Sequence, residues 1–121
     1  MIEIKWDKEG YPTKASLRRL RKAVKEFNKE GVEAFYAALQ KNWYGFCWTE
    51  FQDIGGELKL VLAYHTGGWS GNEEIIAELQ RSPIWGWALE RYDAIGHYYF
   101  RPKEKAQRRA RGLRHESNHQ S

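Results

Sequence analysis

The stretch Glu57–Ile76, "ELKLVLAYHTGGWSGNEEII", decides the fold because it changes from a strand pattern to a helix pattern across one glycine-rich turn. Its first nine residues alternate with a period of two, which is typical of a β-strand with two distinct faces. One face holds Leu58, Leu60, Leu62 and Tyr64, and the other holds Lys59, Val61, Ala63 and His65. The aromatic segment before it, "YGFCWTEFQDI" at 44–54, ends at Gly55–Gly56, so we expect an antiparallel hairpin.

Helical patterns lie on both sides of this hairpin. Apolar residues at spacings of three and four predict an amphipathic helix over 14–28, with Thr13 as its N-cap and Gly31 after its end. The same spacing predicts a second helix over 32–43 and a short one over 72–80.

Two more segments alternate as strands do, "IEIKW" at 2–6 and "GHYYF" at 96–100, while "SPIWGWALERY" at 82–92 indicates a short helical or irregular piece. Helices and strands that do not alternate regularly favour an α+β fold. We therefore expect a small antiparallel sheet of about three strands, covered by two or three helices.

The 121 residues are enough for one domain, which we place at 1–101, followed by a basic tail at 102–121. Residues 101–121 hold seven Lys or Arg and two Glu, a net charge of +5, whereas residues 1–100 hold 13 basic and 14 acidic residues, a net charge of −1. The tail has no aromatic residue and a single leucine, so it cannot bury a core and is expected to be disordered or helical on a partner.

Composition excludes several classes of site. The single cysteine, Cys47, rules out an internal disulfide and a cysteine-based zinc site. The sequence contains no metal-ligand motif and no cofactor fingerprint, so neither a metal nor a cofactor is expected. The first ten residues contain no apolar leader, and no segment approaches the ~18 apolar residues that a membrane span needs. We expect a cytoplasmic protein, in a host cell, without a membrane partner.

The glycine-rich turn has two interpretations. Ser70 and Glu73 form a capping-box pattern, in which each side chain would accept the backbone N–H of the other residue. Gly67 and Gly68 permit positive φ angles, and a helix N-terminus can bind an anion through free N–H groups. Glu73 and Glu74 would oppose such an anion. The turn is therefore either purely structural or part of a ligand site.

Trp69 distinguishes these two interpretations, since a buried ring would make the turn a structural clasp and an exposed ring would make it a binding site. The candidate ligand site would combine this turn with the last strand. Its residues are Trp69, Ser70, Asn72, Glu73, His97 and Tyr99, with Arg91 and Arg101 available for an anion.

The predicted helix over 14–28 offers a second candidate, a nucleic-acid interface. Its basic side chains, together with the tail, could straddle a phosphate backbone. The residues of this interface are Arg18, Arg21 and Lys25 in the helix and Arg108, Arg109 and Arg111 in the tail. A solvated helix face is the alternative, and the neutral charge of residues 1–100 favours it.

A third candidate is a small enzyme. His65 ends one predicted strand and His97 begins another, so adjacent strands could bring the two rings together near Glu73 as a general acid/base pair. Satisfied or exposed histidines are commoner than catalytic ones, so we expect binding rather than catalysis.

Two motifs resemble a family of small uncharacterised phage and prophage proteins: "YPT" at Tyr11–Thr13 and "TGGWSGNE" at Thr66–Glu73. A third family motif, Arg-Gly-Gly-His-Tyr-x-Phe, is altered here to "AIGHYYF" at 94–100. The resemblance covers roughly residues 9–101 and brings no assigned activity. It implies a non-enzymatic accessory protein that binds a host or defence macromolecule or a nucleotide-like ligand, with an anti-defence role as one form.

Overall fold

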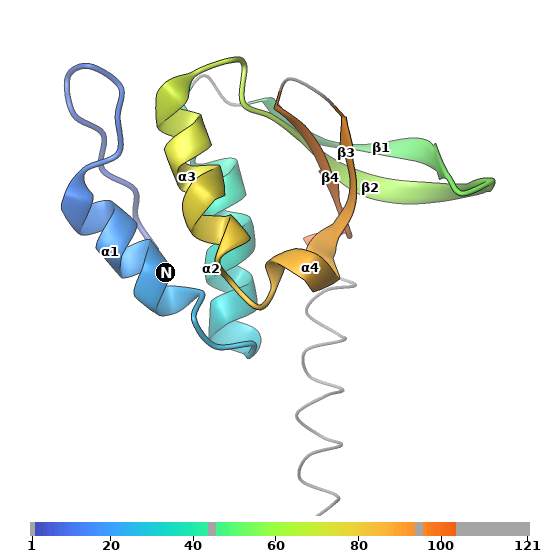
Figure 1. The fold of residues 1–121 in the computed structure, drawn as a ribbon, viewed down its shortest axis with the longest axis horizontal. Helices are drawn as coiled ribbons and strands as arrows, with labels where there is room; N and C mark the ends of the chain where they lie inside the picture. The colour runs from blue at the N-terminus through green and yellow to red at the C-terminus, as the bar shows by residue number, and fades with distance from the viewer. Residues whose placement is uncertain (1, 44–45, 94–95, 104–121) are drawn as a thin grey trace, which may run out of the picture.

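The computed structural model describes residues 2–43, 46–93 and 96–103, which form the α+β fold that the sequence predicts. The helices are α1 (Lys14–Ala23), α2 (Lys29–Gln40), α3 (Ser70–Gln80) and α4 (Trp85–Ala88), and the strands are β1 (Phe46–Ile54), β2 (Glu57–His65), β3 (Leu89–Asp93) and β4 (His97–Phe100). Helices α1, α2 and α3 lie together on one side of the sheet, and the β1–β2 hairpin extends beyond them (Figure 1).

The sheet is antiparallel throughout, with the strand order β1-β2-β4-β3. β1 and β2 pair over all nine residues without a register shift, which confirms the predicted hairpin. Gly55 and Gly56 connect them with φ angles of 63° and 82°. Both glycines therefore take the left-handed conformation that the tightest hairpin turn requires.

The sheet has four strands rather than about three, because the segment 82–92 contains most of β3 as well as α4. β3 lies at the edge of the sheet, with an irregularity between Leu89 and Arg91, and none of its side chains is fully buried. An exposed edge strand needs no apolar alternation. Its charged sequence "LERYD" therefore carries no strand signal.

The main core fills the space between the helices and the helix-facing side of β2 and β4. Large rings supply much of it, and four of them are almost completely buried: Phe35, Tyr36, Tyr64 and Phe100. Phe35 and Phe100 pack edge-to-face with ring centroids 5.7 Å apart, a geometry that aromatic pairs prefer. The core therefore accounts for much of the high aromatic content.

Burial changes along β2 although its two faces are those predicted from the sequence. Leu58 and Leu60 are 70% and 44% exposed because the hairpin extends beyond the helices (Figure 1). On the face away from the helices, Val61, Ala63 and Tyr99 form a second, smaller buried cluster. The sheet thus buries apolar side chains on both faces near its centre and exposes them near the hairpin turn.

Helix α1 begins as predicted and ends early. The Thr13 hydroxyl accepts the backbone N–H of Ser16 at 3.2 Å, which confirms Thr13 as the N-cap. The predicted end at residue 28 is wrong, since α1 stops at Ala23. The carbonyl of the next residue, Val24, accepts a hydrogen bond of 2.9 Å from the Ser82 hydroxyl, so a tertiary contact replaces the expected further helical turn.

Gly31 does not end the first helix, as the sequence had suggested, but lies in the first turn of α2. Its N–H donates to the side chain of Asn28, the N-cap of α2, at 2.8 Å. A Cβ atom at Gly31 would collide with the carbonyl oxygen of Glu26. The glycine is therefore needed for close approach of the chain that enters α2.

The predicted strand "IEIKW" is also wrong. Residues 2–5 have no regular secondary structure, and Trp6 makes a single antiparallel bridge with Pro12 instead of joining the sheet. Lys5 donates its backbone N–H to the Ser16 hydroxyl at 2.8 Å. The segment therefore folds back on its own loop and on the start of α1.

The glycine-rich turn keeps its predicted backbone but not its predicted cap. Gly67 and Gly68 have positive φ angles of 67° and 74°. The capping box is wrong, because Ser70 already belongs to α3 and Trp69 is the N-cap, with no side-chain cap hydrogen bond. The Glu73 carboxylate instead accepts a hydrogen bond of 2.9 Å from the Thr66 hydroxyl.

Asn72 joins three segments of the chain through one fully buried carboxamide. Its Oδ1 accepts the backbone N–H of Trp43 at 2.7 Å, and its Nδ2 donates to the carbonyls of Trp43 at 2.7 Å and Thr66 at 2.9 Å. This side chain therefore fixes the start of α3 against the chain leaving α2 and the chain leaving β2.

We predict that Asn72→Ala lowers the free energy of unfolding by about 2–4 kcal/mol, because buried backbone groups of Trp43 and Thr66 lose their partners. Urea denaturation measures the change. Ser70→Ala is the matched control on the same helix, since Ser70 is exposed, and it should change stability by less than about 0.5 kcal/mol. Equal effects of the two substitutions would contradict the role of Asn72.

Candidate functional site

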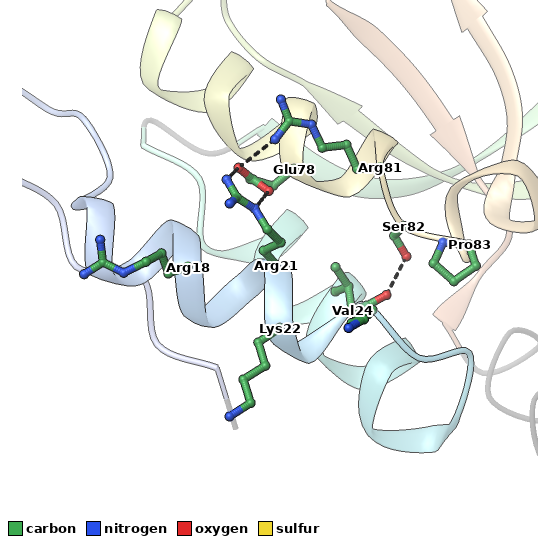
Figure 2. Close-up of a pocket in the computed structure, with 9 residues that line it drawn as sticks. Arg18, Arg21, Lys22, Val24, Glu78, Arg81, Ser82 and Pro83 are labelled. Carbon is green, nitrogen blue, oxygen red and sulfur yellow. Dashed lines mark hydrogen bonds and ion pairs between the residues drawn. The ribbon is translucent and has the colours of Figure 1, made fainter.

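A concave surface between α1 and the C-terminal end of α3 gathers five cationic side chains. We call it the basic groove; its volume is about 660 Å³, and it is lined by Arg18, Arg21, Lys22, Val24, Lys25, Glu78, Arg81, Ser82 and Pro83 (Figure 2). The cations Arg18, Arg21, Lys22 and Lys25 follow at helical spacing, so α1 and the residues after it present them on one side. Arg81 adds a fifth cation from the end of α3.

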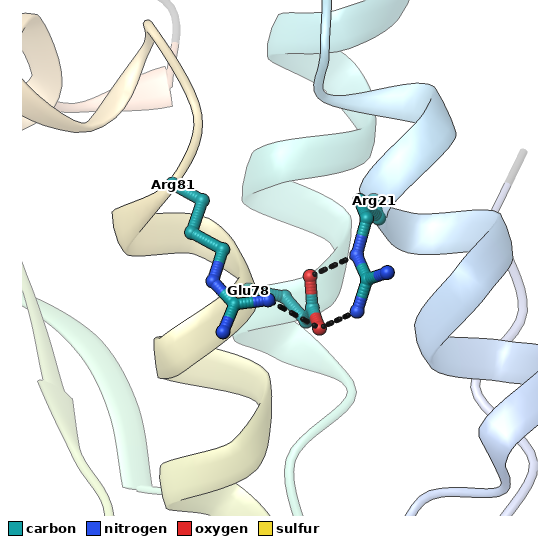
Figure 3. A network of polar contacts seen from close by, with 3 residues as sticks. All are labelled: Arg21, Glu78 and Arg81. Atoms are coloured by element: carbon teal, nitrogen blue, oxygen red, sulfur yellow. Dashed lines mark hydrogen bonds and ion pairs between the residues drawn. The ribbon is translucent and has the colours of Figure 1, made fainter.

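Glu78 holds two of these cations in place. Arg21 donates from Nε and Nη2 to the two oxygens of the Glu78 carboxylate, at 2.9 and 2.6 Å, and Arg81 lies 3.6 Å from the same carboxylate (Figure 3). The hydrogen bonds from Arg21 hold the pKa of the Glu78 carboxyl below its ordinary value. Because the Glu78 side chain is only 7% exposed and the side chains of Arg21 and Arg81 are 57% and 67% exposed, the network orients cations toward solvent.

The groove also has a fixed base. The Ser82 hydroxyl donates to the Val24 carbonyl at 2.9 Å and accepts the backbone N–H of Ile84 at 3.0 Å. These bonds join the end of α1 to the segment after α3, where Val24 and Pro83 line the groove to one side of the labelled cations (Figure 2). The positions of the cations therefore follow from two packed helices rather than from a loose loop.

The groove concentrates charge that the composition conceals. Its five cations and one carboxylate sum to +4, although residues 1–100 sum to −1. The other residues of that segment therefore hold 8 cations and 13 carboxylates, a net charge of −5. The near-neutral net charge of residues 1–100 had favoured a solvated helix face over a nucleic-acid interface. Because the positive and negative charges lie in different places, the net charge no longer favours the solvated face.

The residues of the glycine-rich turn mostly make internal contacts. The Trp69 indole is half-buried and donates from Nε1 to the Gly10 carbonyl at 2.6 Å, and its ring packs against Tyr11 at a centroid distance of 5.6 Å. Asn72 and Glu73 are bonded within the fold as described above. Of the candidate residues in the turn, only Ser70 makes no side-chain hydrogen bond within the described part of the chain, and it is exposed. The turn therefore holds the N-terminal loop through Trp69, whose ring is neither fully buried nor fully exposed.

His97, Tyr99 and Arg91 lie together on the sheet face away from the helices. Arg91 lies over the Tyr99 ring at 6.0 Å and bonds to Asp93 at 2.9 Å. The His97 ring stacks on that of His65, with centroids 3.8 Å apart and planes 12° apart. Alternation along β2 and β4 separates this group from the turn on the helix-facing side.

Arg101 belongs to neither group. Its Nε donates to the Trp87 carbonyl at 2.7 Å, its guanidinium lies 5.3 Å from the Trp87 ring, and it forms an ion pair of 3.3 Å with Glu90. This arginine therefore fastens the end of β4 to the segment around α4. Arg108, Arg109 and Arg111 lie outside the described residues.

The arrangement offers little for acid/base catalysis. Glu73 bonds to Thr66 beside Gly96, on the side of the sheet opposite to the stacked histidines. Burial and the neighbouring His97 lower the pKa of His65, whose Nε2 is buried and has no hydrogen-bond partner in the described part of the chain. Burial also raises the pKa of the Cys47 thiol to about 11, which disfavours a reactive thiolate.

Comparison with family models, with curated proteins and with solved structures finds no match to this chain. Within residues 2–43, 46–93 and 96–103, no three His, Cys, Asp or Glu side chains gather as metal ligands would. No helix in those ranges is both long and apolar enough to cross a membrane.

Sequence reasoning identified Arg18, Arg21 and Lys25, and the structure brings all three to the basic groove. It missed Arg81 and Glu78, which lie more than fifty residues further along the chain. Helical spacing in the sequence indicates the cations of α1. Only the packing of α3 on α1 brings Glu78 and Arg81 close to these cations.

We predict that Glu78→Gln lowers the free energy of unfolding at pH 7 by about 1–3 kcal/mol, because it weakens charge-assisted hydrogen bonds with Arg21. A carboxyl group whose pKa is depressed in the folded state stabilises the fold at pH values above its unfolded-state pKa. This stabilisation is lost as the pH falls. The difference from wild type should therefore shrink below about pH 4.3, the ordinary value for glutamate. Urea denaturation at several pH values tests this, with exposed Glu74→Gln, one turn earlier on α3, as control.

We also predict that acidification destabilises the fold through His65. Its lowered pKa means that the unfolded chain binds a proton more readily, so this contribution to stability is complete above about pH 6.5 and declines as pH falls below that value. His65→Gln should flatten the dependence of stability on pH between about 7 and 5. Thermal unfolding at several pH values measures this dependence. If it is the same in the variant as in the wild type, His65 is not the source of the pH dependence.

Proposed function

We propose that this protein binds nucleic acid through the basic groove, by contacts with the phosphate backbone rather than with bases. The observation that carries the proposal is the net charge of +4 over one concave surface of a body whose total charge is −1. Cations that neutralise phosphates release condensed counterions, and this release supplies most of sequence-independent affinity.

The chemistry of the groove also favours backbone contacts. Arginine presents planar donors that match phosphate oxygens, and Arg21 and Arg81 converge on one buried carboxylate that holds them beside each other. The lining contains no aromatic side chain among the described residues, whereas base-stacking sites depend on such rings. The basic tail, with its net charge of +5, would add phosphate contacts.

The first candidate site has less support. Trp69, Asn72 and Glu73 direct their polar groups to partners within the fold, so few remain for a nucleotide-like ligand or a host protein. The phage or prophage origin that the motifs indicate stays a prediction, and the proposal does not depend on it.

We predict that the double substitution Lys22→Gln/Lys25→Gln weakens binding to a short DNA duplex by about one to two orders of magnitude and reduces the slope of log K against log salt by about 2. Fluorescence anisotropy across a salt series measures both quantities. The physical reason is the loss of two phosphate contacts.

The matched control is Arg19→Gln/Lys29→Gln, which removes the same charge from exposed basic positions outside the groove and should have a much smaller effect. A third protein that lacks residues 104–121 measures the share of the tail. Equal losses in the two double variants would show that net charge alone drives binding. Undiminished binding by the groove variant, abolished by removal of the tail, would overturn the proposed interface.

A further inference from the structure

The outer edge of β1 has the features of a strand that pairs with another strand. β1 is nine residues long, pairs with β2 without a register shift, and contains no Lys, Arg or Pro. These are the features that natural proteins avoid at exposed edges. β3, at the other edge, has five residues, an irregular register and three charged side chains. β1, with Glu50 and Asp53 as its only charged residues over nine positions, is therefore the less protected of the two edges formed by the described strands.

Apolar side chains accompany this edge. Phe51 on β1 is directly opposite Leu60 on β2, and with Leu58 they form a patch on the helix-facing side of the hairpin. Phe51 and Leu58 are 65% and 70% exposed, and Leu60 is 44% exposed. Because the helices do not reach this part of the hairpin (Figure 1), the patch is open beside the free edge. Contiguous exposed apolar groups of this kind mark interaction sites.

We propose that β1 pairs in an antiparallel manner with β1 of a second copy, around a two-fold axis at Phe51. This register places Phe51 opposite Phe51 of the second copy, so that the row of apolar side chains continues from Leu60 across both copies. Directly opposite residues share one face of a sheet, so both helical layers lie on the same side of an eight-stranded sheet. The paired segment, 48–54, lies toward the hairpin turn.

Polar complementarity favours this register over one centred on Glu50. Glu50 lies opposite Gln52 of the second copy, and Asp53 lies opposite Thr49 of the second copy, so each carboxylate faces a neutral side chain that can donate. Within one chain, Gln52 Nε2 already donates to Glu50 and its Oε1 accepts from Arg91, both at 3.2 Å, so Gln52 would share its donor group between the two Glu50 carboxylates. A register centred on Glu50 would instead place two carboxylates directly opposite each other, which destabilises a pair of strands. A two-fold interface must be self-complementary, and the sequence of β1 meets this condition around Phe51. The inference does not depend on nucleic-acid binding.

Sedimentation velocity of the full chain over a concentration series tests the proposal. We expect a monomer–dimer equilibrium that Phe51→Arg weakens by at least about tenfold, because two guanidinium groups then face each other across the axis. Tyr92→Arg is the matched control, since Tyr92 is a 53% exposed aromatic residue on the other edge strand, and it should leave the equilibrium unchanged.

A second pair of variants tests the register itself. Gln52→Lys places an ammonium group opposite Glu50 of the second copy and should tighten the dimer at low salt, whereas Gln52→Glu opposes carboxylates and should weaken it. Circular dichroism verifies that each variant is folded. The proposal is overturned by a wild type that stays monomeric at every concentration, by a dimer that Phe51→Arg does not affect, or by identical behaviour of the two Gln52 variants.

Discussion

The carboxamide of Asn72 is the contact on which the arrangement of the molecule depends. It satisfies both backbone groups of Trp43 and the carbonyl of Thr66, so it fixes the first turn of α3 relative to α2 and to the sheet. Once the start of α3 is fixed, the helix carries Glu78 and Arg81 to the side of α1. The basic groove is thus a consequence of polar contacts formed at the other end of the same helix.

The turn before α3 has a related role. Gly71 allows the carbonyl of Gly10 and the Trp69 ring to approach the helix so closely that a Cβ atom at this position would collide with both. In the motif "TGGWSGNE", nearly every polar side chain therefore has a hydrogen-bond partner within the fold. Its length and its glycines suggested a ligand site in the sequence, yet dense internal contacts require the same unusual residue types.

Sequence patterns anticipated the elements whose signal is local. The hairpin, β4, α3 and the cap of α1 each follow from periodicity or from turn chemistry over a few residues. Two of the errors are local: the Thr66 hydroxyl, seven residues before Glu73, takes the carboxylate expected in the capping box, and β3 pairs with the next strand, β4, although its charged sequence lacks alternation. The early end of α1 depends instead on a contact with Ser82, 58 residues further along the chain. The same holds for the groove, where α1 was recognisable and Arg81 was not.

The segregation of charge has a consequence for motion in solution. The groove lies at α1, whereas Glu50, Asp53 and Glu57 lie on the hairpin at the other end of the molecule (Figure 1). Opposite charges separated in this way give the protein a permanent electric dipole. In the field of a polyanion the molecule experiences a torque that turns α1 toward the polyanion before any surfaces touch. This torque acts only within a few Debye lengths of the polyanion, and the Debye length shortens as ionic strength rises.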